Sequence, residues 1–136
     1  MDAARVAEFL RAHHRAVLAT ARADGSPQLS PVLAVADDDN RILISTRART
    51  AKARNLARDP HAALCIMNDA FFGDWVQADG TAEIVRLPEA MDLLVDYYRR
   101  ASGEHPDWDG YREAMRRENR VILRITITRA GPDLIR

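Results

Sequence analysis

The feature that most constrains the fold is a series of short apolar segments with strand-type patterning, separated by turn signals. In the last segment, Val121, Leu123 and Ile125 alternate with a second set of side chains, which is typical of a strand with one face on a core. Most links between the segments have hairpin length, which favours a meander closing into a small barrel over a parallel sheet with crossover helices. The six expected strands span residues 16–22, 28–36, 41–46, 61–68, 74–86 and 120–129.

Helical periodicity and helix-end signals mark four further segments. Asp2 suits the N-cap of the first helix, and Pro88 suits the first helical position of the third. Pro60 ends the second helix, because the residue before a proline is pushed out of the helical region, and Gly103 ends the third. The expected helices lie within residues 2–13, 50–58, 87–103 and 107–118.

Two glycines mark sharp changes in the backbone. Gly25 lies in the turn at residues 23–27, where a hairpin needs a residue that tolerates positive φ. Gly80 lies inside the long strand at residues 74–86, which predicts a β-bulge or a sharp barrel bend. These elements together predict a mainly β protein with peripheral helices.

Composition and charge exclude several classes of protein. The chain has 136 residues, enough for one hydrophobic core, so we expect a single domain over residues 1–136. Its 20 basic and 20 acidic side chains give zero net charge, whereas nucleic-acid-binding proteins usually carry a positive excess. No run of about 18 apolar residues occurs, and the first residues lack a secretory pattern. We therefore expect a cytoplasmic protein with neither nucleic-acid nor membrane contacts.

The strongest candidate site is the strand–turn–helix segment at residues 41–58. If Thr50 is the N-cap, the N–H groups of Ala51 and Lys52 point off the helix N-terminus and can bind a phosphate. Lys52 is the only lysine of the chain, and the helix dipole disfavours a cation there by about 0.3–1 kcal/mol. A bound anion would offset that cost. A solvated basic face on a surface helix is the competing interpretation.

Other residues that could carry chemistry give weaker signals. Trp75 begins the long strand with Gln77 on the same face, a pattern that core and dimer contacts also produce. His13 and His14 are adjacent and point in different directions, so they do not predict a metal site. Cys65 is the only cysteine, which excludes an intrachain disulfide, and its apolar strand indicates a buried small side chain.

Five segments in order resemble one known family. They are VLAT (17–20), DGSPQLSPV (24–32), ISTRARTAKARNLARDP (44–60), GTAEIV (80–85) and GEHPDWDGYREAM (103–115). The chain resembles the flavin/deazaflavin oxidoreductases of the split β-barrel superfamily, which includes pyridoxamine 5'-phosphate oxidase-like proteins. It is most similar to their actinobacterial F420-dependent branch. The resemblance implies a six-stranded split β-barrel of the FMN-binding type and a homodimer with the cofactor at the subunit interface.

The resemblance also implies which residues hold the phosphate of the cofactor. Thr46, Thr50 and Lys52 match the positions that bind it, and Ser45 and Asn55 lie close by. Coenzyme F420 is the cofactor that this similarity favours, with FMN as the alternative.

Further residues are implied for the ring and for the rest of the cofactor. The strand Ser30–Pro31–Val32 would run beside the flat ring, with its backbone contacting the ring edge. Trp75 and Gln77 would reach the site, from the partner subunit of the dimer. The arginines suited to the acidic tail of F420, which FMN lacks, are Arg47, Arg49 and Arg54.

The implied function is an F420-dependent reductase that transfers a hydride to a small electron-poor organic acceptor. An FMN-dependent oxidoreductase and a non-catalytic carrier of F420 or flavin are the alternatives. Pyridoxamine-phosphate oxidase activity itself is not expected, because Thr50–Ala51–Lys52 replaces the S-R-K triplet of those enzymes. Their C-terminal substrate-binding segment also has no counterpart after Arg129. No side chain stands out as a general acid, so we assign no catalytic residue.

Overall fold

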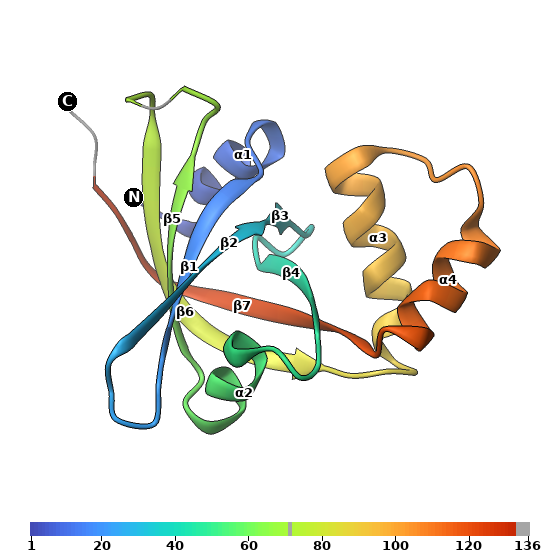
Figure 1. Ribbon diagram of the computed structural model, residues 1–136. Helices are drawn as coiled ribbons and strands as arrows, with labels where there is room; N and C mark the ends of the chain where they lie inside the picture. Colours follow the sequence, from blue (N-terminus) through green and yellow to red (C-terminus); the bar gives the residue numbers. More distant parts are fainter. Residues whose placement is uncertain (71, 133–136) are drawn as a thin grey trace.

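The computed structural model describes residues 1–70 and 72–132. In this part of the chain seven strands form one antiparallel sheet in the order β2-β1-β5-β6-β7-β4-β3, with four helices around it (Figure 1). The strands are β1 (Arg15–Ala21), β2 (Pro27–Leu33), β3 (Val35–Ala36), β4 (Ile42–Arg47), β5 (His61–Met67), β6 (Trp75–Val85) and β7 (Arg120–Gly131). The helices are α1 (Ala3–Ala12), α2 (Ala51–Arg58), α3 (Ala90–Ser102) and α4 (Trp108–Arg117).

The two edge strands of this sheet are neighbours in the sequence. Only Ala34 separates β2 from β3, yet the two strands lie at opposite ends of the strand order. A sheet whose first and last strands are joined by one residue must curl round on itself, and Figure 1 shows the curled sheet. The result is a half-barrel of the split-barrel type.

The expected count of six strands is wrong, because residues 28–36 form two strands instead of one. The Ala34 N–H donates to the His14 carbonyl at 2.8 Å, next to the last β1–β2 pair, and from Val35 onward the chain pairs with β4 instead. The expected meander is also wrong, since β1 lies beside β5 and β4 lies beside β7. The mainly β architecture with peripheral helices is confirmed.

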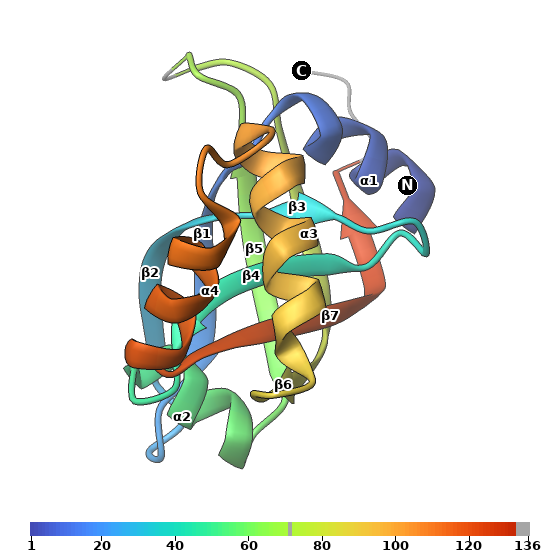
Figure 2. The same cartoon turned by 90° about the vertical axis from the view of Figure 1, so that its right-hand side faces the viewer.

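The sheet buries side chains on both of its faces. Val121, Leu123 and Ile125 of β7 are fully or almost fully buried inside the barrel, as their alternation predicts. Ile122 points the other way and is also fully buried, because α3 and α4 pack over that face (Figure 2). The helical pair therefore covers β4 and β7 from outside the barrel.

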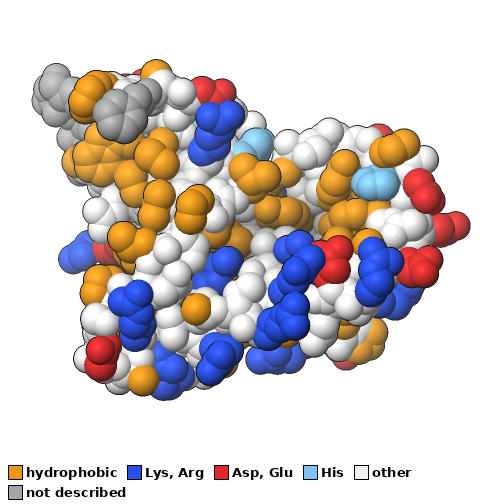
Figure 3. All heavy atoms as spheres, viewed as in Figure 1, with side chains coloured by type: hydrophobic (Ala, Val, Ile, Leu, Met, Phe, Trp, Pro, Cys, Tyr) orange, Lys and Arg blue, Asp and Glu red, His pale blue; other side chains and the backbone are white. Residues whose placement is uncertain are grey.

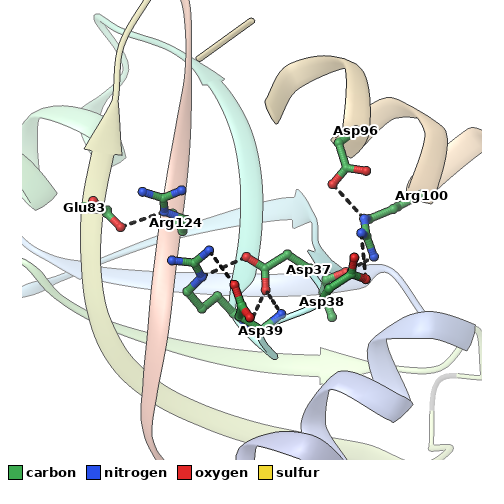
Figure 4. A network of polar contacts seen from close by, with 9 residues as sticks. Asp37, Asp38, Asp39, Glu83, Asp96, Arg100 and Arg124 are labelled. Carbon is green, nitrogen blue, oxygen red and sulfur yellow. Dashed lines mark hydrogen bonds and ion pairs between the residues drawn. The ribbon is translucent and has the colours of Figure 1, made fainter. Parts of the chain in front are cut away.

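An ion pair joins α3 to the turn between β3 and β4 (Figure 4). Arg100 of α3 pairs with Asp96 at 2.8 Å on its own helix and with Asp38 at 3.0 Å in the turn between β3 and β4. Asp37, which is buried, binds the Arg41 guanidinium in the same turn at 2.9 Å. Arg100 therefore connects α3 to this turn, and the Asp37–Arg41 pair fixes the shape of the turn.

Most local predictions agree with the structure. Asp2 caps α1 by accepting from Arg5 at 3.0 Å, and Gly25 and Gly103 have φ values of 86° and 83°. The ladder between β6 and β7 shifts register at Gly80, which confirms the bulge. Pro88 is not the first helical residue: it lies in a turn, and α3 begins at Ala90.

Candidate functional site

Helix α2 begins where the sequence predicts, with Thr50 as its N-cap. The Thr50 hydroxyl oxygen accepts from the Ala53 N–H at 3.4 Å and donates to the Arg47 carbonyl at 3.0 Å. The buried Thr46 hydroxyl lies 3.0 Å from the Thr50 hydroxyl, so both hydroxyl groups already have partners. The N–H groups of Ala51 and Lys52 have no intrahelical acceptor, and they are the donors that remain for an anion.

Lys52 lies within a group of cations. Partial burial lowers the pKa of Lys52 below its ordinary value of 10.5, and the nearby charge of Arg120 lowers it further. Glu118 accepts from Arg120 at 2.8 Å and from Arg47 at 3.2 Å, so one carboxylate faces two arginines, and Lys52 adds a further positive charge near Arg120. The excess positive charge destabilises the protein alone and favours an anion at the start of α2.

Beside α2, the edges of β2 and β4 come close together but do not pair with each other. In the described residues β2 pairs with β1 alone, and β4 pairs with β3 only at Ile42 and Leu43. The remaining part of β4 faces the free edge of β2, and these edges carry backbone donors and acceptors. A planar heterocycle with amide-like groups on its rim can form hydrogen bonds with such an edge. Ser30, Pro31, Val32 and Ser45 all lie on these two strands.

Tyr97 of α3 lies at one end of this split and was missed by sequence reasoning. Its hydroxyl donates to the Leu33 carbonyl at 2.8 Å. Burial raises the pKa of Tyr97, while the Ser45 backbone and the charge of Arg120 act in the opposite direction, so the phenol lies near both. The Tyr97 side chain therefore joins the edge of β2 to the helical pair.

Asn55 and Ser30 are connected through two side chains that sequence reasoning also missed. The Asn55 side-chain amide donates to the Thr20 hydroxyl at 3.1 Å, and the Thr20 hydroxyl donates to the side-chain amide oxygen (Oε1) of Gln28 at 3.3 Å. The Gln28 amide then donates to the Ser30 hydroxyl at 2.9 Å. Asn55 therefore fixes α2 against the β1–β2 hairpin. Thr20 could have been found, because it is a polar residue at an inward position of its strand.

Trp75 and Gln77 do not approach α2 within one chain. Trp75 pairs with Met67 at the far end of β5, whereas His61 begins β5 just after α2. A strand of seven residues is about 20 Å long, so Trp75 and the end of α2 lie near opposite ends of β5.

Trp75 belongs to an apolar outer face that no helix of the described chain covers. Leu29 and Leu33 of the edge strand β2 are 62% and 50% exposed. The register of β1, β2, β5 and β6 places further apolar side chains beside them. Figure 3 shows hydrophobic side chains over the left-hand part of the molecule, on the side of these strands. This apolar face comprises Val17, Ala19, Leu29, Pro31, Leu33, Ala63, Cys65, Met67 and Trp75.

A basic hollow of about 440 Å³ lies where the ladder between β4 and β7 ends. Its walls are the loop after β4 and the turn after α4, and the Ala48 N–H donates to the Asn119 carbonyl at 3.0 Å between them. Figure 3 shows basic side chains along the lower rim of the molecule, around α2 and the end of α4. Sequence reasoning grouped Arg54 with Arg47 and Arg49, whereas the structure groups Arg117 with them. The lining residues are Arg47, Ala48, Arg49, Arg117, Glu118 and Asn119.

Two other kinds of site find no support in the described residues. These residues contain no group of three or more side chains placed to bind a metal ion. Their helices are too short or too polar for any of them to cross a lipid bilayer.

Residues 3–131 match the family model of pyridoxamine 5'-phosphate oxidase. A conserved hypothetical protein from Mycobacterium tuberculosis is 30% identical over 96% of this chain and 82% of its own, with a TM-score of 0.76. An F420 reductase is 21% identical over 91% of this chain and 94% of its own, with a TM-score of 0.71. HutZ, a heme storage protein from Vibrio cholerae, is 19% identical over 94% of this chain and 92% of its own, with a TM-score of 0.71. The last two likenesses show the fold alone.

Proposed function

The chain belongs to the pyridoxamine 5'-phosphate oxidase family, and from that premise we propose that it is an oxidoreductase that uses coenzyme F420. The observation that carries the proposal is the meeting of the α2 N-terminus with the free edges of β2 and β4. The α2 N-terminus offers hydrogen-bond donors for a phosphate, and the adjoining edges of β2 and β4 offer backbone groups for the rim of a flat ring. The reduced cofactor would supply a hydride to a small electron-poor organic acceptor.

The phosphate end is assigned to the first turn of α2. The N–H groups of Ala51 and Lys52 and the Lys52 ammonium would donate to the phosphate, while Thr46 and Thr50 hold the turn in shape. Ser45 lies one residue before Thr46 on β4. This donor set fits a phosphate, because it combines free amides with a partly buried cation whose pKa is lowered by burial and by the charge of Arg120.

The basic hollow supports F420 over FMN. Arg47, Arg49 and Arg117 line a space beside the phosphate end, and guanidinium groups pair well with carboxylates. An acidic tail attached to the phosphate would find these arginines, whereas FMN has no such extension. FMN remains the alternative cofactor for the same strand edges.

We also propose that the apolar face is covered by a second copy of the chain in a homodimer. Single exposed apolar side chains are common on protein surfaces, but this face joins the exposed Leu29 and Leu33 to further apolar side chains in one patch. Contiguous patches of this kind mark interaction sites. Pairing of two copies is the arrangement that can bring Trp75 and Gln77 of one chain to the α2 region of the other. The edge at Ser30–Pro31–Val32 would then lie close to the interface.

The dimer can be tested with Leu29→Glu, which places a charge at the most exposed apolar side chain on the β2 edge of this face. Sedimentation should show a dimer for the wild type and a monomer for Leu29→Glu, with cofactor affinity lost as well. Ala4→Glu on the exposed side of α1 is the matched control and should stay dimeric. A monomeric wild type that binds cofactor fully would refute the shared site.

The reaction can be tested with enzymatically reduced F420 and a panel of activated alkenes and other conjugated acceptors. Acceptor-dependent oxidation of F420 is the expected result, and it should be lost in Lys52→Met. Tight binding without turnover of any acceptor would instead favour the carrier. Turnover with reduced FMN but not with F420 would select the alternative cofactor.

A further inference from the structure

Glu118 is the only carboxylate that lines the basic hollow among the described residues. A single oxygen, Oε1, accepts from the Arg47 guanidinium at 3.2 and 3.4 Å and from the Arg120 guanidinium at 2.8 and 3.0 Å. The hydrogen bonds from Arg120 and then from Arg47 hold the pKa of Glu118 below its ordinary range. Glu118 is therefore ionised at neutral pH.

Glu118 has two opposing effects on an acidic ligand. It holds the Arg47 and Arg120 guanidinium groups in place, which favours binding. It also neutralises one of their charges and repels an anion in the same hollow, which opposes binding. Arg49 and Arg117 form no ion pair within the described residues, so they remain available to the ligand.

The charge effect should exceed the positioning effect. The two arginines are also held by their strands, because Arg47 and Arg120 are paired residues at the end of the ladder between β4 and β7. A neutral amide at position 118 would still offer an oxygen to both guanidinium groups. Removal of the negative charge would therefore leave the arginines in place and strengthen the attraction for an anion.

We propose that Glu118 is a specificity-determining residue that weakens the binding of polycarboxylate ligands in the basic hollow, by competing for Arg47 and by repelling their negative charge. The inference rests on the proposed function for the natural ligand, an acidic tail attached to the cofactor. The competition itself concerns only the hollow, so it can be measured without any cofactor.

The test is a titration of citrate, a compact tricarboxylate, into the wild type, Glu118→Gln and Glu113→Gln. Glu113 is exposed on α4 outside the hollow, and its substitution changes the net charge by the same amount. Glu118→Gln should bind citrate roughly tenfold more tightly than the wild type, with a steeper dependence on salt, whereas Glu113→Gln should match the wild type. Thermal unfolding of each variant establishes that it is folded.

Three results would overturn the inference. Equal or weaker citrate binding by folded Glu118→Gln would make Glu118 only a support for the arginines. An equal gain in Glu113→Gln would reduce the effect to net charge. Undiminished citrate binding in Arg117→Gln would place the anion outside the hollow. A failure of F420 and FMN to bind, with the citrate result intact, would refute the proposed function and leave this inference standing.

Discussion

Replacement of Lys52 by methionine should weaken cofactor binding while leaving the protein alone at least as stable. Methionine keeps the apolar stem of the side chain and removes its charge. Loss of one charge-assisted contact to phosphate should cost about 1.5–3 kcal/mol of binding free energy. That cost corresponds to a dissociation constant about 10- to 150-fold higher.

The stability of the free protein should change in the opposite direction. A lysine whose pKa is lowered by folding destabilises the folded state while it is charged, and the helix dipole adds about 0.3–1 kcal/mol at this position. Lys52→Met should therefore unfold at the same temperature as the wild type or up to a few degrees higher. The difference should shrink as the pH rises through the lowered pKa towards 10.5, where Lys52 loses its proton.

Calorimetric titration with F420 or FMN, together with thermal unfolding from neutral to alkaline pH, measures both effects. Arg11→Met, on an exposed position of α1, is the control for the loss of one positive charge. Unchanged cofactor affinity in Lys52→Met would refute the assignment of the phosphate. Clear destabilisation of the free variant would refute the view that Lys52 is unfavourably placed without an anion.

Three further outcomes are expected. Thr20→Val should lower the free energy of unfolding by about 1–3 kcal/mol in urea, because the buried Asn55 amide loses its acceptor; a cost near zero would show that water replaces it. Gly80→Ala should lower the melting temperature sharply, since an added Cβ would clash with the Thr126 carbonyl oxygen; a normal melting temperature would contradict this packing. Burial raises the pKa of Tyr111 from 10.0 to about 12, so folding stability should fall between these pH values, and Tyr111→Phe should remove that part of the fall.

The sequence predicted those parts of the fold that local patterns control. The strands, the caps of α1 and α2 and the bulge at Gly80 all follow from residues close together in the chain. The division of residues 28–36 does not, because it depends on a change of partner strand: β2 pairs with β1 as far as Leu33, whereas Val35 and Ala36 pair with β4. Ile122 was also misjudged, since the helices that bury it are separate elements of the sequence.

The candidate site divides in the same way. The start of α2 could be predicted because Thr50, Ala51 and Lys52 are adjacent. Tyr97 and Arg117 could not, because α3 and α4 bring them to the site from some 45 to 65 positions further along the chain. Trp75 lies away from α2 within one chain, so its place in the site rests on the proposed dimer.

The most direct test of the central claim is a titration of F420 and of FMN into the folded wild-type protein. The α2 N-terminus and the edges of β2 and β4 predict binding of F420 with a dissociation constant below about 100 µM, at one cofactor per chain and more tightly than FMN. If neither cofactor bound in that range, these features would not form a flavin or deazaflavin site, and the proposed function would be wrong.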